Sequence, residues 1–84
     1  MPHRDPRHAL AERVQSVRRE IFGECGGPVL ARKLKLPYRT WMRYEAGTMM
    51  PAEILLRFLR LTTAHPYWLL TGRGPKYRTG KPTD

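Results

Sequence analysis

Apolar positions at helical spacing dominate the first quarter of the chain. They fall at Leu10, Val14, Val17 and Ile21, at intervals of four, three and four, which places them on one face of a helix. Asp5 followed by Pro6 is typical of a helix start, because the aspartate can cap the first turn and a proline there needs no backbone donor. Gly23 ends the pattern. We therefore expect a helix over residues 5–22.

Two shorter helices are predicted in the middle of the chain. The stretch GECGG, residues 23–27, contains three glycines and is expected to be a loop. Pro28 then begins a helix over residues 28–34, which can pack through Leu30, Ala31 and Leu34. A second helix follows over residues 38–46, where Trp41 and Tyr44 repeat at helical spacing before Gly47.

The apolar pattern after Gly47 predicts two more helices. Residues 52–62 carry a broad apolar stripe, with Arg57 and Arg60 expected to face out, and Pro66 begins a short helix over residues 66–71. Trp41, Phe58 and Trp68 are expected in the core. The pattern thus indicates an all-α domain of five helices over residues 1–72, followed by a flexible basic tail over residues 73–84.

Charge narrows the class of partner. Sixteen Lys and Arg residues against seven Asp and Glu residues give the 84-residue chain a net charge of +9. Such a surface attracts polyanions, nucleic acid first and an acidic membrane or protein surface second. The alternative is that the charge only keeps a small domain in solution.

Several classes of function lack the residues that they need. The single cysteine, Cys25, excludes an intramolecular disulfide and fits a reducing compartment. His3, His8 and His65 are too scattered for a zinc pattern, and no Ser/His/Asp or paired-carboxylate arrangement suggests an enzyme. No apolar run approaches the length of a membrane span, and the first residues, MPHRDPRH, lack the apolar core expected of a signal peptide. We expect a cytoplasmic, non-catalytic protein with no metal, cofactor, membrane or small-molecule substrate.

The stretch LARKLKLPYRTWMRYEAG, residues 30–47, resembles the helix-turn-helix of the Cro/CI (XRE-like) phage-repressor family. The family pattern is Ala-x-x-Leu-Gly-aliphatic-Ser/Pro-x-x-Thr-aliphatic-x-x-aromatic-Glu-x-Gly. The matching positions hold Ala31, Leu34, Lys35, Leu36, Pro37, Thr40, Trp41, Tyr44, Glu45 and Gly47. The segment from Pro66 to Gly72 also resembles the last helix of the family. The resemblance implies a compact five-helix, lambda-repressor-like DNA-binding domain.

The same resemblance implies structural roles for part of the motif. The frame consists of Ala31, Leu36, Trp41, Glu45 and Gly47. A small residue at position 31 lets the two helices cross closely, and Leu36 plugs the turn into the core. Glu45 is implied to pair with either Arg18 or Arg19. Lys35 departs from the family, which places glycine there for a positive φ; lysine can adopt that conformation at a cost of roughly 1 kcal/mol.

DNA contacts are implied for the outward side of the motif. The resemblance assigns base contacts to Tyr38, Arg39 and Arg43, and backbone contacts to Gly27, Pro28, Arg32, Lys35 and Thr40. Arg39 is the leading candidate, since a guanidinium can donate two hydrogen bonds to guanine O6 and N7. It could instead be solvated or paired with an acid. Tyr38 could meet a thymine methyl or a phosphate, or only cover the turn, and the methyl of Thr40 is expected to face inward.

The leading function is sequence-specific binding of double-stranded DNA in transcriptional control, as a repressor or another regulator. A homodimer is one option, because a single reading helix covers about half a site, and Met49, Tyr67 or Leu70 could supply its contact. A monomer that uses the basic tail is the other. The alternative function is a non-catalytic protein-interaction module, an adaptor or antitoxin-like partner, with the same fold.

Overall fold

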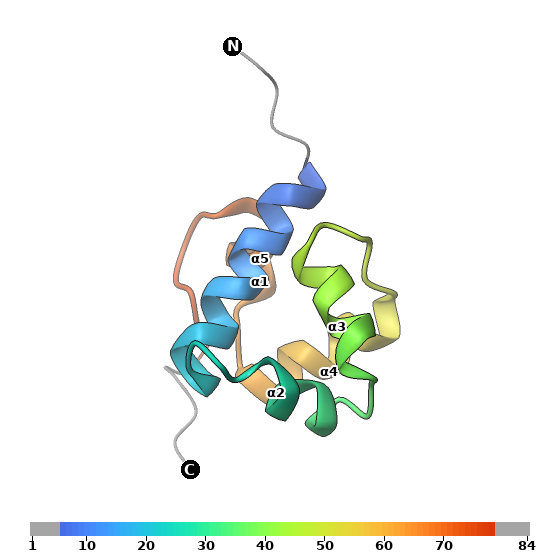
Figure 1. The fold of residues 1–84 in the computed structure, drawn as a ribbon. Helices are drawn as coiled ribbons and strands as arrows, with labels where there is room; N and C mark the ends of the chain where they lie inside the picture. Colours follow the sequence, from blue (N-terminus) through green and yellow to red (C-terminus); the bar gives the residue numbers. More distant parts are fainter. Residues whose placement is uncertain (1–5, 79–84) are drawn as a thin grey trace.

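Five α-helices and no β-strand make up residues 6–78, the part of the chain that the computed structural model describes (Figure 1). The helices are α1 (Pro6–Phe22), α2 (Gly27–Lys33), α3 (Tyr38–Glu45), α4 (Ala52–Thr62) and α5 (Pro66–Thr71). This architecture confirms the all-α prediction. The predicted cap at Asp5 lies outside the described residues. None of the described helices is long and apolar enough to cross a membrane.

The helices surround one core. α1 packs against α2, α3 and α5, and α2 packs against α3, while α4 lies behind them in Figure 1. The buried core side chains are Val14, Val17, Leu30, Ala31, Leu34, Trp41, Phe58, Ala64 and Leu69. Trp68, expected in the core, is half-buried and packs against it.

Trp41 is the aromatic centre of this core and anchors α3. Its ring is fully buried and stacks on Phe58 at a centroid distance of 5.6 Å and an interplanar angle of 27°. The ring of Tyr44 meets it edge-on at 6.1 Å. The side of α3 that carries Trp41 therefore faces the core, and the opposite side faces solvent.

The turn from α2 to α3 is short and hydrogen-bonded. Lys35 has a φ of +60°, the left-handed conformation expected at this position, and its N–H donates to the carbonyl of Arg32. The N–H of Leu36 donates to the carbonyl of Ala31 at 2.9 Å. Leu36 is half-buried against the core. These bonds satisfy carbonyls at the end of α2 and set the angle at which α3 leaves the turn.

The glycine-rich loop before α2 is shorter than the sequence predicted, because α2 begins at Gly27 rather than Pro28. Gly26 packs directly on the preceding helix: a Cβ there would lie 2.2 Å from the carbonyl oxygen of Phe22. Any side chain at position 26 would collide with backbone, so the tight entry into α2 requires glycine.

The segment from Arg73 to Arg78, predicted to be part of a flexible tail, packs on the domain. The N–H of His65 donates to the carbonyl of Lys76, and the N–H of Arg78 donates to that of Thr63, at 2.8 and 2.9 Å. Side chains also hold the segment, since the hydroxyl of Tyr77 donates to Glu20 of α1 at 2.7 Å. Figure 1 shows the segment running beside α1. We call residues 75–78 the C-terminal strap; the rest of the predicted tail lies outside the described residues.

Candidate nucleic-acid interface

α3 presents a polar outer face. Tyr38, Arg39, Met42 and Arg43 are all exposed, whereas Trp41 on the opposite face is buried. The three residues predicted to contact bases thus share the exposed face of one helix. Thr40 is half-buried, so only part of it is available to a backbone contact.

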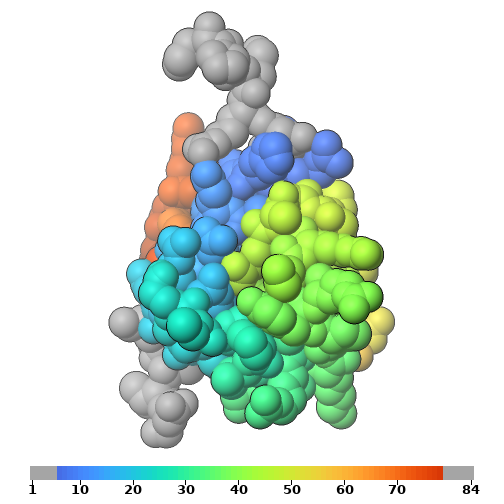
Figure 2. Space-filling model, in the orientation of Figure 1, coloured from blue at the N-terminus to red at the C-terminus, as the bar shows by residue number. Residues whose placement is uncertain are grey.

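A group of cations extends this face across the turn and the end of α2. Its members, which we call the α2–α3 cations, are Arg32, Lys33, Lys35, Arg39 and Arg43. All five are exposed, and none forms an ion pair within the described part of the chain. Figure 2 shows α2 and α3 next to each other on one face of the molecule. Free charge of one sign is therefore concentrated there.

Four acidic side chains, by contrast, pair with other cations. Glu20 pairs with Lys76, Glu24 with Arg19 and Glu53 with Arg57. Glu45 is the only acid of α3, and it pairs with Arg18 of α1. These acids leave the charge of the α2–α3 cations uncompensated.

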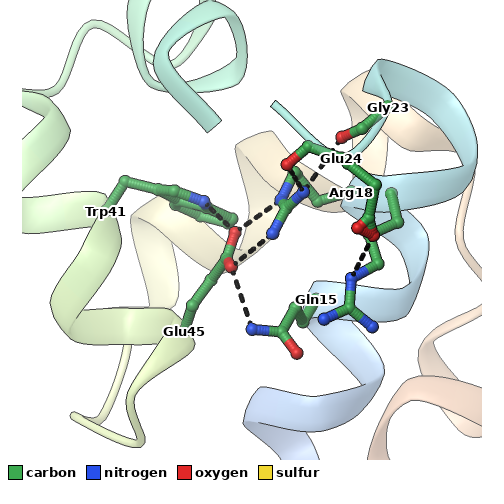
Figure 3. Close-up of polar contacts among 7 residues, drawn as sticks. Gln15, Arg18, Gly23, Glu24, Trp41 and Glu45 are labelled. Atoms are coloured by element: carbon green, nitrogen blue, oxygen red, sulfur yellow. Dashed lines mark hydrogen bonds and ion pairs between the residues drawn. The ribbon is translucent and has the colours of Figure 1, made fainter. Parts of the chain in front are cut away.

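Arg18 and Glu45 tie α3 to α1 in the network of Figure 3. Nε and Nη2 of Arg18 each donate to a different carboxylate oxygen of Glu45 at 2.9 Å. The indole N–H of Trp41 and the amide of Gln15 also donate to this carboxylate. The remaining guanidinium nitrogen of Arg18 donates to the carbonyls of Gly23 and Glu24. One side chain thus fixes both α3 and the loop that leads into α2.

Burial and hydrogen bonding act in opposite directions on the pKa values of Arg18 and Glu45. Burial by itself would raise the pKa of the Glu45 carboxyl, but the hydrogen bonds from Arg18, Trp41 and Gln15 outweigh burial and lower it. The hydrogen bond to Glu45 raises the pKa of Arg18 despite the opposing effect of burial. Of the two arginines predicted as partners, Arg18 is the one that pairs with Glu45.

Tyr38 lies directly over Gly27. A Cβ at position 27 would lie 2.7 Å from Cε1 of the Tyr38 ring, so this contact requires glycine at position 27. Gly27 is buried, so its backbone can contact a phosphate only if Tyr38 moves away. Pro28 is exposed. Tyr38 therefore covers the start of α2, whereas the sequence suggested that it could cover the turn, and its side chain remains 45% exposed.

One residue at this face, Gln15, was missed in the sequence analysis. An open depression of about 260 Å³ lies between α1 and α3 and is lined by Gln15, Tyr38, Met42, Glu45 and Ala46. Met42 follows Tyr38 by one helical turn and lies on the outer face, as its helical spacing indicates. Gln15 could not have been assigned, since nothing in the sequence indicates which residue of α1 lies opposite α3.

Among residues 6–78 no group of three His, Cys, Asp or Glu side chains could hold a metal ion. Comparison of the chain with protein-family models, curated proteins and solved structures found no match. The argument for function therefore depends on the geometry and charge of this face.

Proposed function

We propose that the protein binds double-stranded DNA in a sequence-specific manner and acts in transcriptional control. In this proposal α2, the turn and α3 form a helix-turn-helix of the lambda-repressor-like type. α3 enters the major groove, which is about 12 Å wide and admits one helix.

The observation that carries the proposal is the arrangement of free charge around α3. The α2–α3 cations are exposed and form no ion pair with any residue of the range 6–78, and two of them lie on the helix that also presents Tyr38 and Met42. Cations beside phosphates supply affinity and salt dependence, and side chains on base edges supply sequence preference. This surface has both kinds of side chain.

A rigid support for α3 favours base reading over loose electrostatic attraction. Trp41 anchors the helix in the core, and the bonds of Arg18 to Glu45 fix its C-terminal end to α1. Hydrogen bonds to base edges discriminate between sequences only when their donors are held in a defined position. Arg39 and Arg43 stand on this supported helix and are proposed to contact guanine.

A dimer would give the affinity that one helix cannot supply. We expect two copies to place their α3 helices in successive major grooves, about one helical turn of DNA apart. Met49, Tyr67 and Leu70 are exposed apolar side chains outside the DNA-facing surface. They are the candidates for the contact between copies.

The test is selection of binding sites from random duplexes, followed by titration of the preferred duplex and a scrambled one at several salt concentrations. We expect a preference well above tenfold, since specific binders usually exceed their non-specific affinity by about 10³-fold or more. Arg39→Ala should relax the preference at one base position, whereas Lys33→Ala should weaken all duplexes alike and reduce the salt slope by about one. A preference below roughly tenfold would contradict the proposal.

A second candidate, a protein-interaction module, is favoured by one observation. Val29, Tyr38 and Met42 are exposed apolar or aromatic side chains on α2 and α3. An acidic partner with an apolar contact could use the same face. In that case duplex DNA would show only salt-sensitive attraction, with no base preference to lose in Arg39→Ala.

A further inference from the structure

Two rows of side chains run along the exposed face of α3. Arg39 and Arg43, one helical turn apart, form a cationic row. Tyr38, Met42 and Ala46 are also spaced one helical turn apart. They form a neighbouring row that is apolar except for the tyrosine hydroxyl. Tyr38 is 45% exposed and Met42 is 52% exposed. An apolar row thus lies beside a cationic row on the helix proposed to read DNA.

The two large members of the apolar row differ in freedom. Tyr38 packs on Gly27, so part of its ring rests on the protein at the start of α2. Met42 lines the open depression together with Gln15 and Tyr38. A methionine side chain is unbranched and polarisable, and it can adapt to a small apolar group brought close to it. Met42 is therefore the more adaptable side chain, beside a ring that packs on the protein.

We propose that Met42, supported by Tyr38, determines specificity by contacting the C5-methyl group of a thymine next to a guanine that Arg39 or Arg43 contacts. This inference depends on the proposed DNA binding. In the major groove, guanine offers two acceptors to arginine and thymine offers the only apolar group. Side-by-side cationic and apolar rows match that alternation. An apolar partner protein would leave the cationic row without a counterpart.

The experiment replaces thymines of the selected duplex with uracil, one position at a time. Uracil keeps the base pair and the O4 acceptor and lacks only the methyl group. We expect the unmodified protein to bind the duplex about three- to fivefold more weakly at one or two positions, the effect of burying a single methyl group. With Met42→Ala, thymine and uracil duplexes should bind equally at those positions.

Two further variants separate this contact from a general effect on the fold. Leu56→Ala removes an apolar side chain that is 56% exposed and lies on α4, away from α3, and it should keep the full preference for thymine over uracil. Met42→Leu keeps an apolar side chain and should retain most of the preference. Because Met42 is exposed, thermal unfolding of the three variants should match that of the unmodified protein.

The outcomes distinguish this inference from the proposed function. If Arg39→Ala relaxes base preference but no uracil substitution changes affinity by more than roughly 1.5-fold, DNA reading stands and the methyl contact is overturned. Equal weakening of thymine and uracil duplexes by Met42→Ala also overturns it, because Met42 would then act without regard to the methyl group. If selection yields no preferred duplex, both proposals fail together.

Discussion

The guanidinium of Arg18 and the carboxylate of Glu45 form a doubly hydrogen-bonded ion pair that joins the middle of α1 to the C-terminal end of α3. Their side chains are only 9% and 12% exposed. The indole N–H of Trp41 donates to the same carboxylate. Glu45 therefore holds a core side chain and a side chain of α1 together. The orientation of α3 depends on this carboxylate.

Arg18→Ala should destabilise the domain by about 3 kcal/mol, because it leaves a largely buried carboxylate without its cation. Urea unfolding followed by circular dichroism would measure the change. Arg19→Ala is the matched control. It breaks the exposed pair with Glu24 and should cost less than about 1 kcal/mol. Equal effects of the two variants would show that the Arg18 pair has no special structural role.

Acid should destabilise the protein through Glu45. Its pKa is lowered in the folded state, so its contribution to stability is complete above the unfolded value of roughly 4.3 and is lost as pH falls through the lower, folded value. The free energy of unfolding, measured from pH 7 down to pH 3, should fall less steeply for Glu45→Gln than for the unmodified protein. At pH 7 the variant should already be less stable. Parallel pH profiles would contradict this assignment.

Gly27→Ala should disturb DNA recognition through Tyr38 rather than through α2 itself. The new methyl group would meet the tyrosine ring at 2.7 Å and displace it. We expect loss of base preference together with a small loss of stability. In the Tyr38→Ala background the same substitution should have little further effect, giving a coupling energy of about 0.5–1.5 kcal/mol in the double-mutant cycle. Additive effects would show that the two residues act independently.

Lys35→Gly should change stability and binding in opposite directions. Glycine adopts the observed φ of +60° without the strain of a side chain, so unfolding should cost up to about 1 kcal/mol more. The lost cation should weaken binding to specific and scrambled duplexes by the same factor and lower the salt slope by about one. Lys33→Gly, within α2, is the control: it should lower stability.

The C-terminal strap should contribute to stability through Tyr77. Its hydroxyl donates to Glu20, and burial followed by this hydrogen bond raises the pKa of the phenol. The bond is partly open to solvent, so we expect Tyr77→Phe to cost about 1 kcal/mol in urea unfolding. Tyr67→Phe removes an exposed hydroxyl and should have almost no effect. A strap that detaches readily would show no difference between the two.

Local signals in the sequence located the helices well. Apolar spacing and the Pro and Gly punctuation placed all five within a residue or two of their observed bounds, because these signals act within one turn of chain. The positive φ of Lys35 was implied by the resemblance to a family that places glycine at this turn position. Residues 73–78 were mistaken for part of a flexible tail, because their Gly, Pro and charged side chains carry no sign of the distant groups to which the segment bonds.

The sequence by itself determined the helical order of the chain, its excess of positive charge and the candidate reading residues of α3. Only the tertiary structure decided that Arg18 rather than Arg19 meets Glu45, that Tyr38 lies on Gly27, and that Glu20 holds the C-terminal strap. The physical reason is the same in each case. These contacts join residues far apart in the chain, and their geometry depends on how the helices cross once the core around Trp41 has formed.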